Sequence, residues 1–235
     1  MIGLDFFKKI FLADSNITIF DVGAHHGDSV NEFLELFPRA KIYAFEPDDR
    51  NFNALKARYS GESRVEILNL AISNQDGNAI LYRNNYDATH SLLPFNTSEI
   101  NRWADASDFR NEDAVEIRQV TLDSFCASRD ISSIDILKLD TQGGELMAFQ
   151  GGETLLSQQA IGCIFCEVEF RPLYENQPLF WDISNHLISR KYNFVNIVYP
   201  KTSEMGILSW ADAIYVNSIL WHHLEKKHSA GKIIS

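Results

Sequence analysis

The sequence lacks the features that would mark a membrane, secreted or repetitive protein. It has no run of about 18 apolar residues, the length needed to cross a bilayer, and no internal repeat or low-complexity tract. Charged residues interrupt the apolar positions of its first 16 residues, unlike the core of a signal peptide. We therefore expect a cytoplasmic protein without stable membrane insertion.

Basic residues are also scarce. The chain has 21 Lys and Arg against 32 Asp and Glu, a formal net charge of -11. Proteins that bind nucleic acids gather Lys and Arg on one surface to neutralise phosphates. We therefore expect no nucleic-acid partner. The sequence does not fix the oligomeric state.

Cysteine is also scarce, since the chain has three cysteine residues. An odd count does not build a disulfide framework and fits a reducing compartment. Cys163 and Cys166 have the spacing of a CxxC pair, but they lie in the apolar run 161–170, which predicts a strand. Residues three apart on a strand point to opposite faces, so neither a redox nor a zinc pair is predicted.

Apolar strand-like runs alternate with amphipathic, helix-like runs along the chain. The first half predicts strands at 17–22, 41–45 and 65–72, with helices at 29–37 and 50–59 between them. Strands joined by helices must be parallel neighbours, linked by right-handed crossovers. The pattern predicts an α/β fold with a Rossmann-like, doubly wound, mostly parallel sheet.

The second half continues the alternation after a polar segment. Further strands are predicted at 78–83, 115–120, 134–139, 161–170, 194–199 and 211–216, and helices at 122–128, 144–156 and 180–191. The run 134–139 is almost wholly apolar, as in a central strand covered on both faces. The chain 1–235 is predicted to be one domain, with a lid or substrate-binding insertion at about 84–114. A short helix at the N-terminus and a solvated C-terminal tail complete the expectation.

A cofactor site is predicted where the first two strands end. Asp21 closes the first strand and Glu46 the second, and ligands of doubly wound sheets bind at the carboxyl ends of strands. Gly23 and Gly27 allow a sharp turn and would bring backbone N–H groups close to a ligand. The two oxygens of Glu46 can accept both hydroxyls of a ribose.

The charge of Asp21 favours one class of nucleotide-like cofactor. A carboxylate directly before the loop would repel the pyrophosphate of NAD, and the GxGxxG pattern of NAD sites is missing. A sulfonium cofactor that carries an ammonium group would gain from the same charge. S-adenosylmethionine is therefore the predicted cofactor, and an NAD-dependent oxidoreductase is the alternative.

Several segments, in this order, resemble the FkbM-type methyltransferases: FDVGAHHGDSV, YAFEPDDRNFNAL, NLAISNQDGNAILY, VTLDSFC, IDILKLDTQGGELMAFQGG and IFCEVEFRPLYENQPLF. The resemblance covers roughly residues 17–216. It implies a class I methyltransferase fold, with an antiparallel C-terminal strand. The chain has His25 where the family usually has Asn, and Gln142 where an acid is frequent.

The resemblance also implies which residues bind S-adenosylmethionine. Ala71 and Ile72 would lie near the adenine, and Asp140 beside the sulfonium. The cofactor residues predicted in this way are Asp21, Gly23, Ala24, His25, Gly27, Glu46, Pro47, Ala71, Ile72 and Asp140.

Methyl transfer to a hydroxyl needs an oriented acceptor oxygen and a base that removes its proton. The predicted catalytic residues are Asp140, His90 and Glu167; His26 and Glu169 are further candidates. Strand alternation puts Glu167 and Glu169 on one face. Asp140, Glu145 and Glu167 have oxygens that suit a divalent cation, but no spacing demands one, so no resident metal is predicted.

The sequence thus predicts an S-adenosylmethionine-dependent methyltransferase. By the family resemblance, it would methylate a hydroxyl oxygen of a small-molecule or glycan acceptor. A catalytically silent module that binds the cofactor or a partner protein is the alternative from another functional class.

Overall fold

A seven-stranded sheet forms the centre of the computed structural model, which describes residues 4–98, 109–203 and 205–231. The strand order is β3-β2-β1-β7-β8-β10-β9. The bounds are β1 (Thr18–Val22), β2 (Lys41–Phe45), β3 (Val65–Leu68), β7 (Ile134–Leu139), β8 (Ile161–Glu169), β9 (Tyr192–Thr202) and β10 (Leu208–Asn217). Neighbouring strands are parallel except at β10, which runs antiparallel to both β8 and β9. The predicted α/β class and antiparallel C-terminal strand are confirmed.

Helices cover both faces of this sheet. One face carries α3 (Leu122–Ser128), α4 (Glu145–Gln150), α5 (Glu153–Ser157) and α6 (Phe180–Ser189); the other carries η1 (Leu4–Lys9), α1 (Asp28–Leu36), α2 (Asp49–Arg58) and α7 (Ser218–Gly231). Phe125 and Phe149 are buried on the first face, Phe7 and Phe33 on the second. Each fully buried side chain of this kind stabilises the fold by about 1.5–3 kcal/mol.

The alternation of side chains along β8 explains why Cys163 and Cys166 lie on opposite faces of the sheet. Cys163 packs in the core on the side of α1, whereas Cys166 packs in the core on the side of α3 and α4. Both are free and buried. The prediction that they face opposite sides of one strand is confirmed.

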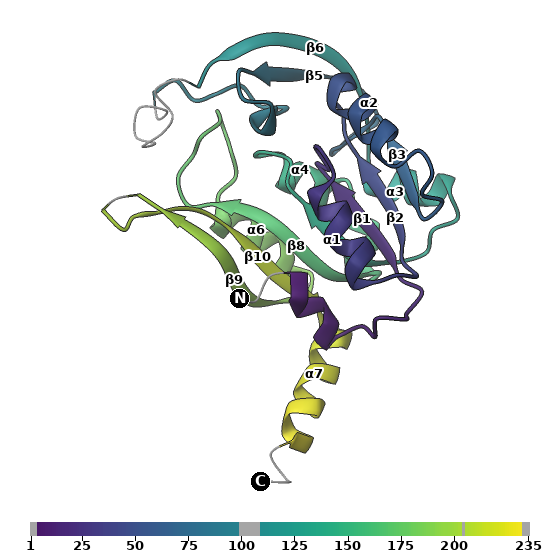
Figure 1. Ribbon diagram of the computed structural model, residues 1–235. Helices are drawn as coiled ribbons and strands as arrows, with labels where there is room; N and C mark the ends of the chain where they lie inside the picture. Colours follow the sequence, from purple (N-terminus) through teal and green to yellow (C-terminus); the bar gives the residue numbers. More distant parts are fainter. Residues whose placement is uncertain (1–3, 99–108, 204, 232–235) are drawn as a thin grey trace.

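A smaller sheet holds β4 (Ala71–Ile72), β5 (Gly77–Asn84) and β6 (Asn111–Val120) in the order β4-β6-β5. β5 and β6 are antiparallel and flank the polar segment predicted as an insertion, which contains η2 (Asp87–Thr89). In Figure 1 this pair lies at the opposite end of the picture from α7. Residues 99–108, with Trp103, lie outside the described residues, so the lid stays a prediction.

One expectation was wrong. The single strand expected at 65–72 is two strands in different sheets, β3 and β4. The C-terminal tail forms the helix α7, which exposes His222 and His223 and packs Leu220, Trp221 and Leu224 against the core. Among the described helices none has the length and apolar character to span a membrane.

Candidate functional site

A cavity of about 630 Å³ opens at the carboxyl ends of β1, β2, β7 and β8. Pockets of this size take drug-sized or nucleotide-sized ligands. Of the residues predicted for the site, those that line the cavity are Gly23, His25, Glu46, Pro47, Ala71, Ile72, His90, Asp140 and Glu167. Asp21, Ala24 and Gly27 are absent from its lining. The cavity therefore lies at the carboxyl ends of the strands, as predicted, but three residues of the β1 segment do not line it.

The loop after β1 is shaped by close backbone contacts. Gly23 has a φ of 77°, and a Cβ there would lie 1.8 Å from the carbonyl oxygen of Asp140. The N–H groups of Gly23 and Ala24 both donate to the carbonyl of Phe45, at 3.0 Å. These two N–H groups are therefore bonded within the protein, and the part that the loop plays in holding a cofactor stays a prediction.

Asp21 lies behind the loop, in an ion pair. Its side chain is fully buried, and Oδ1 is 3.1 Å from Nζ of Lys138 on β7. The Ser29 hydroxyl donates to the other oxygen at 2.5 Å. Burial alone would lower the pKa of Lys138, but the carboxylates of Asp21 and Asp140 raise it. Because Lys138 neutralises Asp21, the charge that we assigned to attraction of a sulfonium is already balanced inside the protein.

Glu46 places a carboxyl group on the cavity wall at the end of β2. Its oxygens accept hydrogen bonds from the N–H groups of His25 and Asp48, each at 2.9 Å. Burial raises the pKa of Glu46 to about 7, against the lowering effect of these two bonds. Each carboxylate oxygen has a second lone pair, so both can still accept a ligand hydroxyl.

An apolar wall adjoins Glu46. Phe45, Leu70, Ala71, Ile72 and Leu81 line this part of the cavity. A flat, uncharged ring fits here because no charged side chain would lose hydration against it. The predicted neighbours of the adenine, Ala71 and Ile72, therefore lie where an adenine ring could bind.

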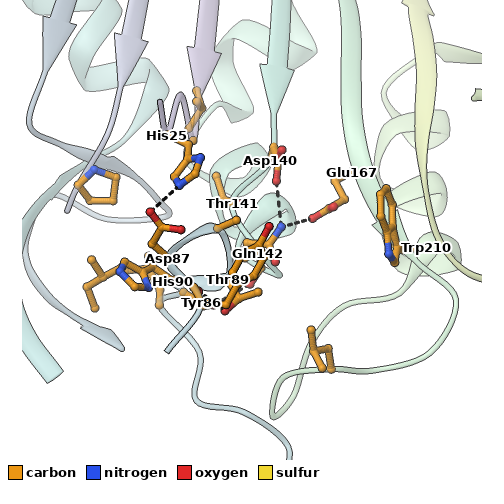
Figure 2. A pocket seen from close by; sticks show the side chains of 18 of the residues that line it. His25, Tyr86, Asp87, Thr89, His90, Asp140, Thr141, Gln142, Glu167 and Trp210 are labelled. Atoms are coloured by element: carbon orange, nitrogen blue, oxygen red, sulfur yellow. Dashed lines mark hydrogen bonds and ion pairs between the residues drawn. The ribbon is translucent and has the colours of Figure 1, made fainter. Parts of the chain in front are cut away.

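The opposite wall carries the predicted catalytic carboxylates (Figure 2). Nε2 of Gln142 donates to Asp140 at 3.0 Å and to Glu167 at 2.7 Å. Gln142 has a φ of 55°, uncommon for a residue other than glycine, and its Oε1 lies 3.0 Å from the hydroxyl of Tyr174. The indole of Trp210 lies beside Glu167. Gln142 thus holds the carboxyl groups of Asp140 and Glu167 close to each other on this wall.

The acids behind this wall share a buried, negatively charged environment. Burial raises the pKa of Glu167, and the nearby charges of Asp140 and Glu169 raise it further. Burial and the charge of Glu145 raise the pKa of Glu169 in the same way. Asp212 on β10, opposite Glu167 in the sheet, has a pKa raised to about 7 by burial and by Asp140. Protonation is the route by which a crowded, buried group of acids lowers its mutual repulsion.

His90 lies on the cavity but is held by structural contacts. Its side chain is 8% exposed, its Nδ1 accepts the N–H of Asn84 at 3.1 Å, and its Nε2 faces Asp48 at 3.9 Å. Burial lowers its pKa. A neutral ring that accepts at Nδ1 carries its proton on Nε2, so neither nitrogen is available to take a proton from an acceptor. These contacts do not favour His90 as the base, and its predicted catalytic role stays a prediction.

The sequence analysis did not assign roles to Lys138, Asp87, Tyr174 or Trp210. The sequence did indicate a buried ion pair at Lys138, because a lysine inside the apolar run 134–139 needs a buried partner. Asp87 is in contact with His25 and His26 in the structure. Tyr174 and Trp210 had no signal, because both come from chain segments far from β7: Tyr174 is buried and bonds Gln142, and Trp210 lines the cavity.

Comparison with known proteins places the chain among methyltransferases. The model of the Methyltransferase FkbM domain matches residues 21–195. The 2-O-methyltransferase NoeI of Sinorhizobium fredii (strain NBRC 101917 / NGR234) is 26% identical over 162 residues, which are 68% of this chain and 66% of NoeI. The match thus spans slightly less than two thirds of the length of that relative.

Two solved structures that are similar to this chain are methyltransferases. An S-adenosylmethionine-dependent methyltransferase from Aquifex aeolicus has a TM-score of 0.42 and 12% identity, with 90% of this chain and 88% of that chain covered. Precorrin-6y C5,15-methyltransferase from Geobacter metallireducens GS-15 has a TM-score of 0.47 and 12% identity, with coverages of 90% and 85%.

The alternative of an NAD-dependent oxidoreductase does not agree with the family match, whereas S-adenosylmethionine, the cofactor predicted from the sequence, does. The fold, the cavity at the strand ends and a match that covers most of the chain lead to one conclusion: the chain belongs to the FkbM methyltransferase domain family.

Proposed function

We propose that this methyltransferase transfers the methyl group of S-adenosylmethionine to a hydroxyl oxygen of a sugar unit or another small polar metabolite. The observation that carries the proposal is the wall formed by Asp140, Gln142 and Glu167 beside Trp210. Carboxyl and amide groups offer acceptors and donors to hydroxyls, and an indole face packs on the apolar face of a sugar ring. The name of the relative NoeI, a 2-O-methyltransferase, agrees with an oxygen acceptor.

The other half of the cavity fits the cofactor. Glu46 would accept the ribose hydroxyls, while Ala71, Ile72 and Pro47 would enclose the adenine. His25, Gly23 and Asp140 would lie around the remainder of the cofactor. When bound, S-adenosylmethionine supplies an electrophilic methyl carbon on a positively charged sulfur.

Asp140 is the proposed base. Its side chain is 40% exposed, so it can reach an acceptor, and its Oδ2 lies 3.7 Å from the cationic Nζ of Lys138. Asp140 would take the hydroxyl proton as the acceptor oxygen forms its bond to the methyl carbon. The electron pair of the broken carbon–sulfur bond stays on sulfur.

Gln142 and Glu167 would position the acceptor. The bonds from Nε2 of Gln142 fix Asp140 and Glu167 relative to each other. Burial and nearby acids raise the pKa of Glu167. In its protonated form Glu167 would donate a hydrogen bond to a second hydroxyl of the acceptor. This would place the reacting oxygen next to the proposed base.

The test is detection of a methylated product by intact mass after incubation with S-adenosylmethionine and a library of glycans and small polyols. Asp140→Asn should lower the turnover number by about 10²–10⁴-fold, the usual contribution of a positioned base. Glu112→Gln, which changes an exposed acid on β6, is the matched control and should leave turnover unchanged.

Product in the wild type without a loss in Asp140→Asn would eliminate Asp140 as the base. Cofactor binding without any methylated product would favour the silent-module alternative. A cytoplasmic location and the absence of a nucleic-acid partner stay predictions from the sequence.

A further inference from the structure

Two histidines of the β1 loop meet an aspartate of the segment between β5 and β6. The Nε2 atoms of His25 and His26 each lie 3.2 Å from Oδ2 of Asp87. The three ligand atoms lie within 4.8 Å of one another. Figure 2 shows the imidazole of His25 directed toward Asp87, on the cavity wall. The group lies apart from the acids Asp140 and Glu167.

The spacing of these atoms fits the ligands of a single ion. Zinc binds imidazole nitrogen at about 2.0–2.1 Å and carboxylate oxygen at about 2.0–2.2 Å, so neighbouring ligand atoms of a tetrahedral site are about 3.3–3.5 Å apart. The observed 3.2 Å is close to this edge length. Nε2 of His25 is buried, and Oδ2 of Asp87 is the charged atom that faces it. A cation bound by both atoms would balance the charge of the carboxylate.

The alternative to a metal ion is hydrogen bonding to Asp87 alone. The rings of His25 and His26 are stacked, with centroids 3.8 Å apart and planes inclined by 22°. A neutral imidazole that carries its proton on Nε2 can donate it to Asp87. Zinc titration separates the two arrangements.

We propose that His25, His26 and Asp87 bind a divalent transition-metal ion of the zinc class. Two nitrogens and one oxygen from protein leave a fourth position, as in zinc sites that keep a water ligand. Imidazole nitrogen suits zinc and its neighbours in the first transition row, whereas magnesium and calcium prefer sites built from oxygen.

The ion would connect two parts of the cavity that the sheet does not join. His25 is anchored by its N–H bond to Glu46, and Asp87 belongs to η2. Metal binding would therefore hold the polar segment against the β1 loop at the edge of the cavity. This inference does not depend on the acceptor or on Asp140, so it can fail or succeed independently of the proposed function.

Calorimetric titration of the EDTA-dialysed protein with ZnCl2 tests the proposal, with MgCl2 as the comparison ion. We expect one zinc ion per chain at this site and no response to magnesium. The cobalt-loaded protein should show the visible absorption of a tetrahedral Co²⁺ site. His25→Asn removes the ligand and keeps a residue that tolerates the φ of 47° at this position. It should weaken zinc binding by at least about a hundredfold, since losing even a supporting partner of a ligand costs 10–100-fold.

Asp87→Asn should weaken zinc binding similarly, whereas His222→Asn, in the exposed histidine pair of α7, should not. Circular dichroism of each variant separates loss of the site from loss of the fold. Absence of zinc binding in the wild type, or unchanged affinity in folded His25→Asn and Asp87→Asn, would overturn the proposal.

Discussion

The two sides of the cavity bury carboxyl groups in different ways. Beside the β1 loop, Asp21 is fully buried and paired with Lys138 at 3.1 Å. On the other side, Glu167 and Glu169 are buried near Glu145 and Asp212, and burial and the charges of nearby carboxylates raise their pKa values. The first side pairs its acid with a cation, whereas the second crowds acids together and so favours their protonated forms.

The difference shows that the residue type alone does not determine how the charge of a buried acid is accommodated. A carboxylate paired with a buried cation serves structure, because its charge is balanced inside the protein. Crowded acids with raised pKa values can take up and release protons, as proton-transfer chemistry needs. Four experiments test this difference between the two sides.

The largest effect is expected from Lys138→Met. The variant leaves Asp21 buried without its cation and should lower the free energy of unfolding by about 3–5 kcal/mol, measured by urea denaturation. The double variant Asp21→Asn/Lys138→Met should recover most of the loss, because it removes both charges. An equal loss in both variants would show that Lys138 acts by packing and not by pairing.

Gly23→Ala should destabilise the loop itself. The added Cβ would meet the carbonyl oxygen of Asp140 at 1.8 Å, at a φ of +77°. Gly206 has a φ of +76° with nothing near its Cβ position, so Gly206→Ala measures the backbone cost alone. We expect a loss of about 1 kcal/mol for Gly206→Ala and at least about 2 kcal/mol more for Gly23→Ala, by thermal unfolding. Equal losses would mean that the loop can move away from β7.

The variant Glu169→Gln tests the crowded acids through the pH dependence of the free energy of unfolding. The folded state raises the pKa of Glu169 above its ordinary 4.5, so its contribution to stability is complete below pH 4.5 and is lost as pH rises toward the folded pKa. Relative to wild type, the variant should become progressively more stable as pH rises from 4.5 to 8, by denaturation at each pH.

The exposed Glu62 is the control for this experiment. Hydrogen bonds from Arg64 lower its pKa to about 2, so its contribution changes only below pH 4.5. The difference between Glu62→Gln and wild type should therefore stay constant from pH 4.5 to 8. A constant difference for Glu169→Gln as well would show that Glu169 is ionised throughout.

The smallest effect is expected from Glu46→Ala. Loss of two acceptor oxygens should weaken the affinity for S-adenosylhomocysteine by roughly tenfold or more, about 1.4 kcal/mol, measured by calorimetry. Asn69→Ala is a nearby control, because Asn69 bonds only the backbone carbonyls of Glu46 and Pro47. Unchanged affinity in Glu46→Ala would place the ribose elsewhere.

Some elements were predictable because their signals are local. The apolar run 134–139 became the central strand β7, and Thr121 caps α3 at the residue where the predicted helix begins. Alternation in β8 also predicted that Glu167 and Glu169 share the cavity wall. Periodicity and capping act over a few residues, so a single sequence carries them.

The α/β class, the strand ends that form the cavity and the position of Glu46 could thus be predicted from the sequence alone. Three contacts are visible in the tertiary structure and not in the sequence. They are the pairing of Lys138 with Asp21, the bonds of Gln142 to Asp140 and Glu167, and the contact of Asp87 with His25 and His26. These contacts join residues far apart in the chain, and their geometry depends on the packing of whole elements. Local patterns cannot encode that packing, because each pattern fixes only where its own segment points.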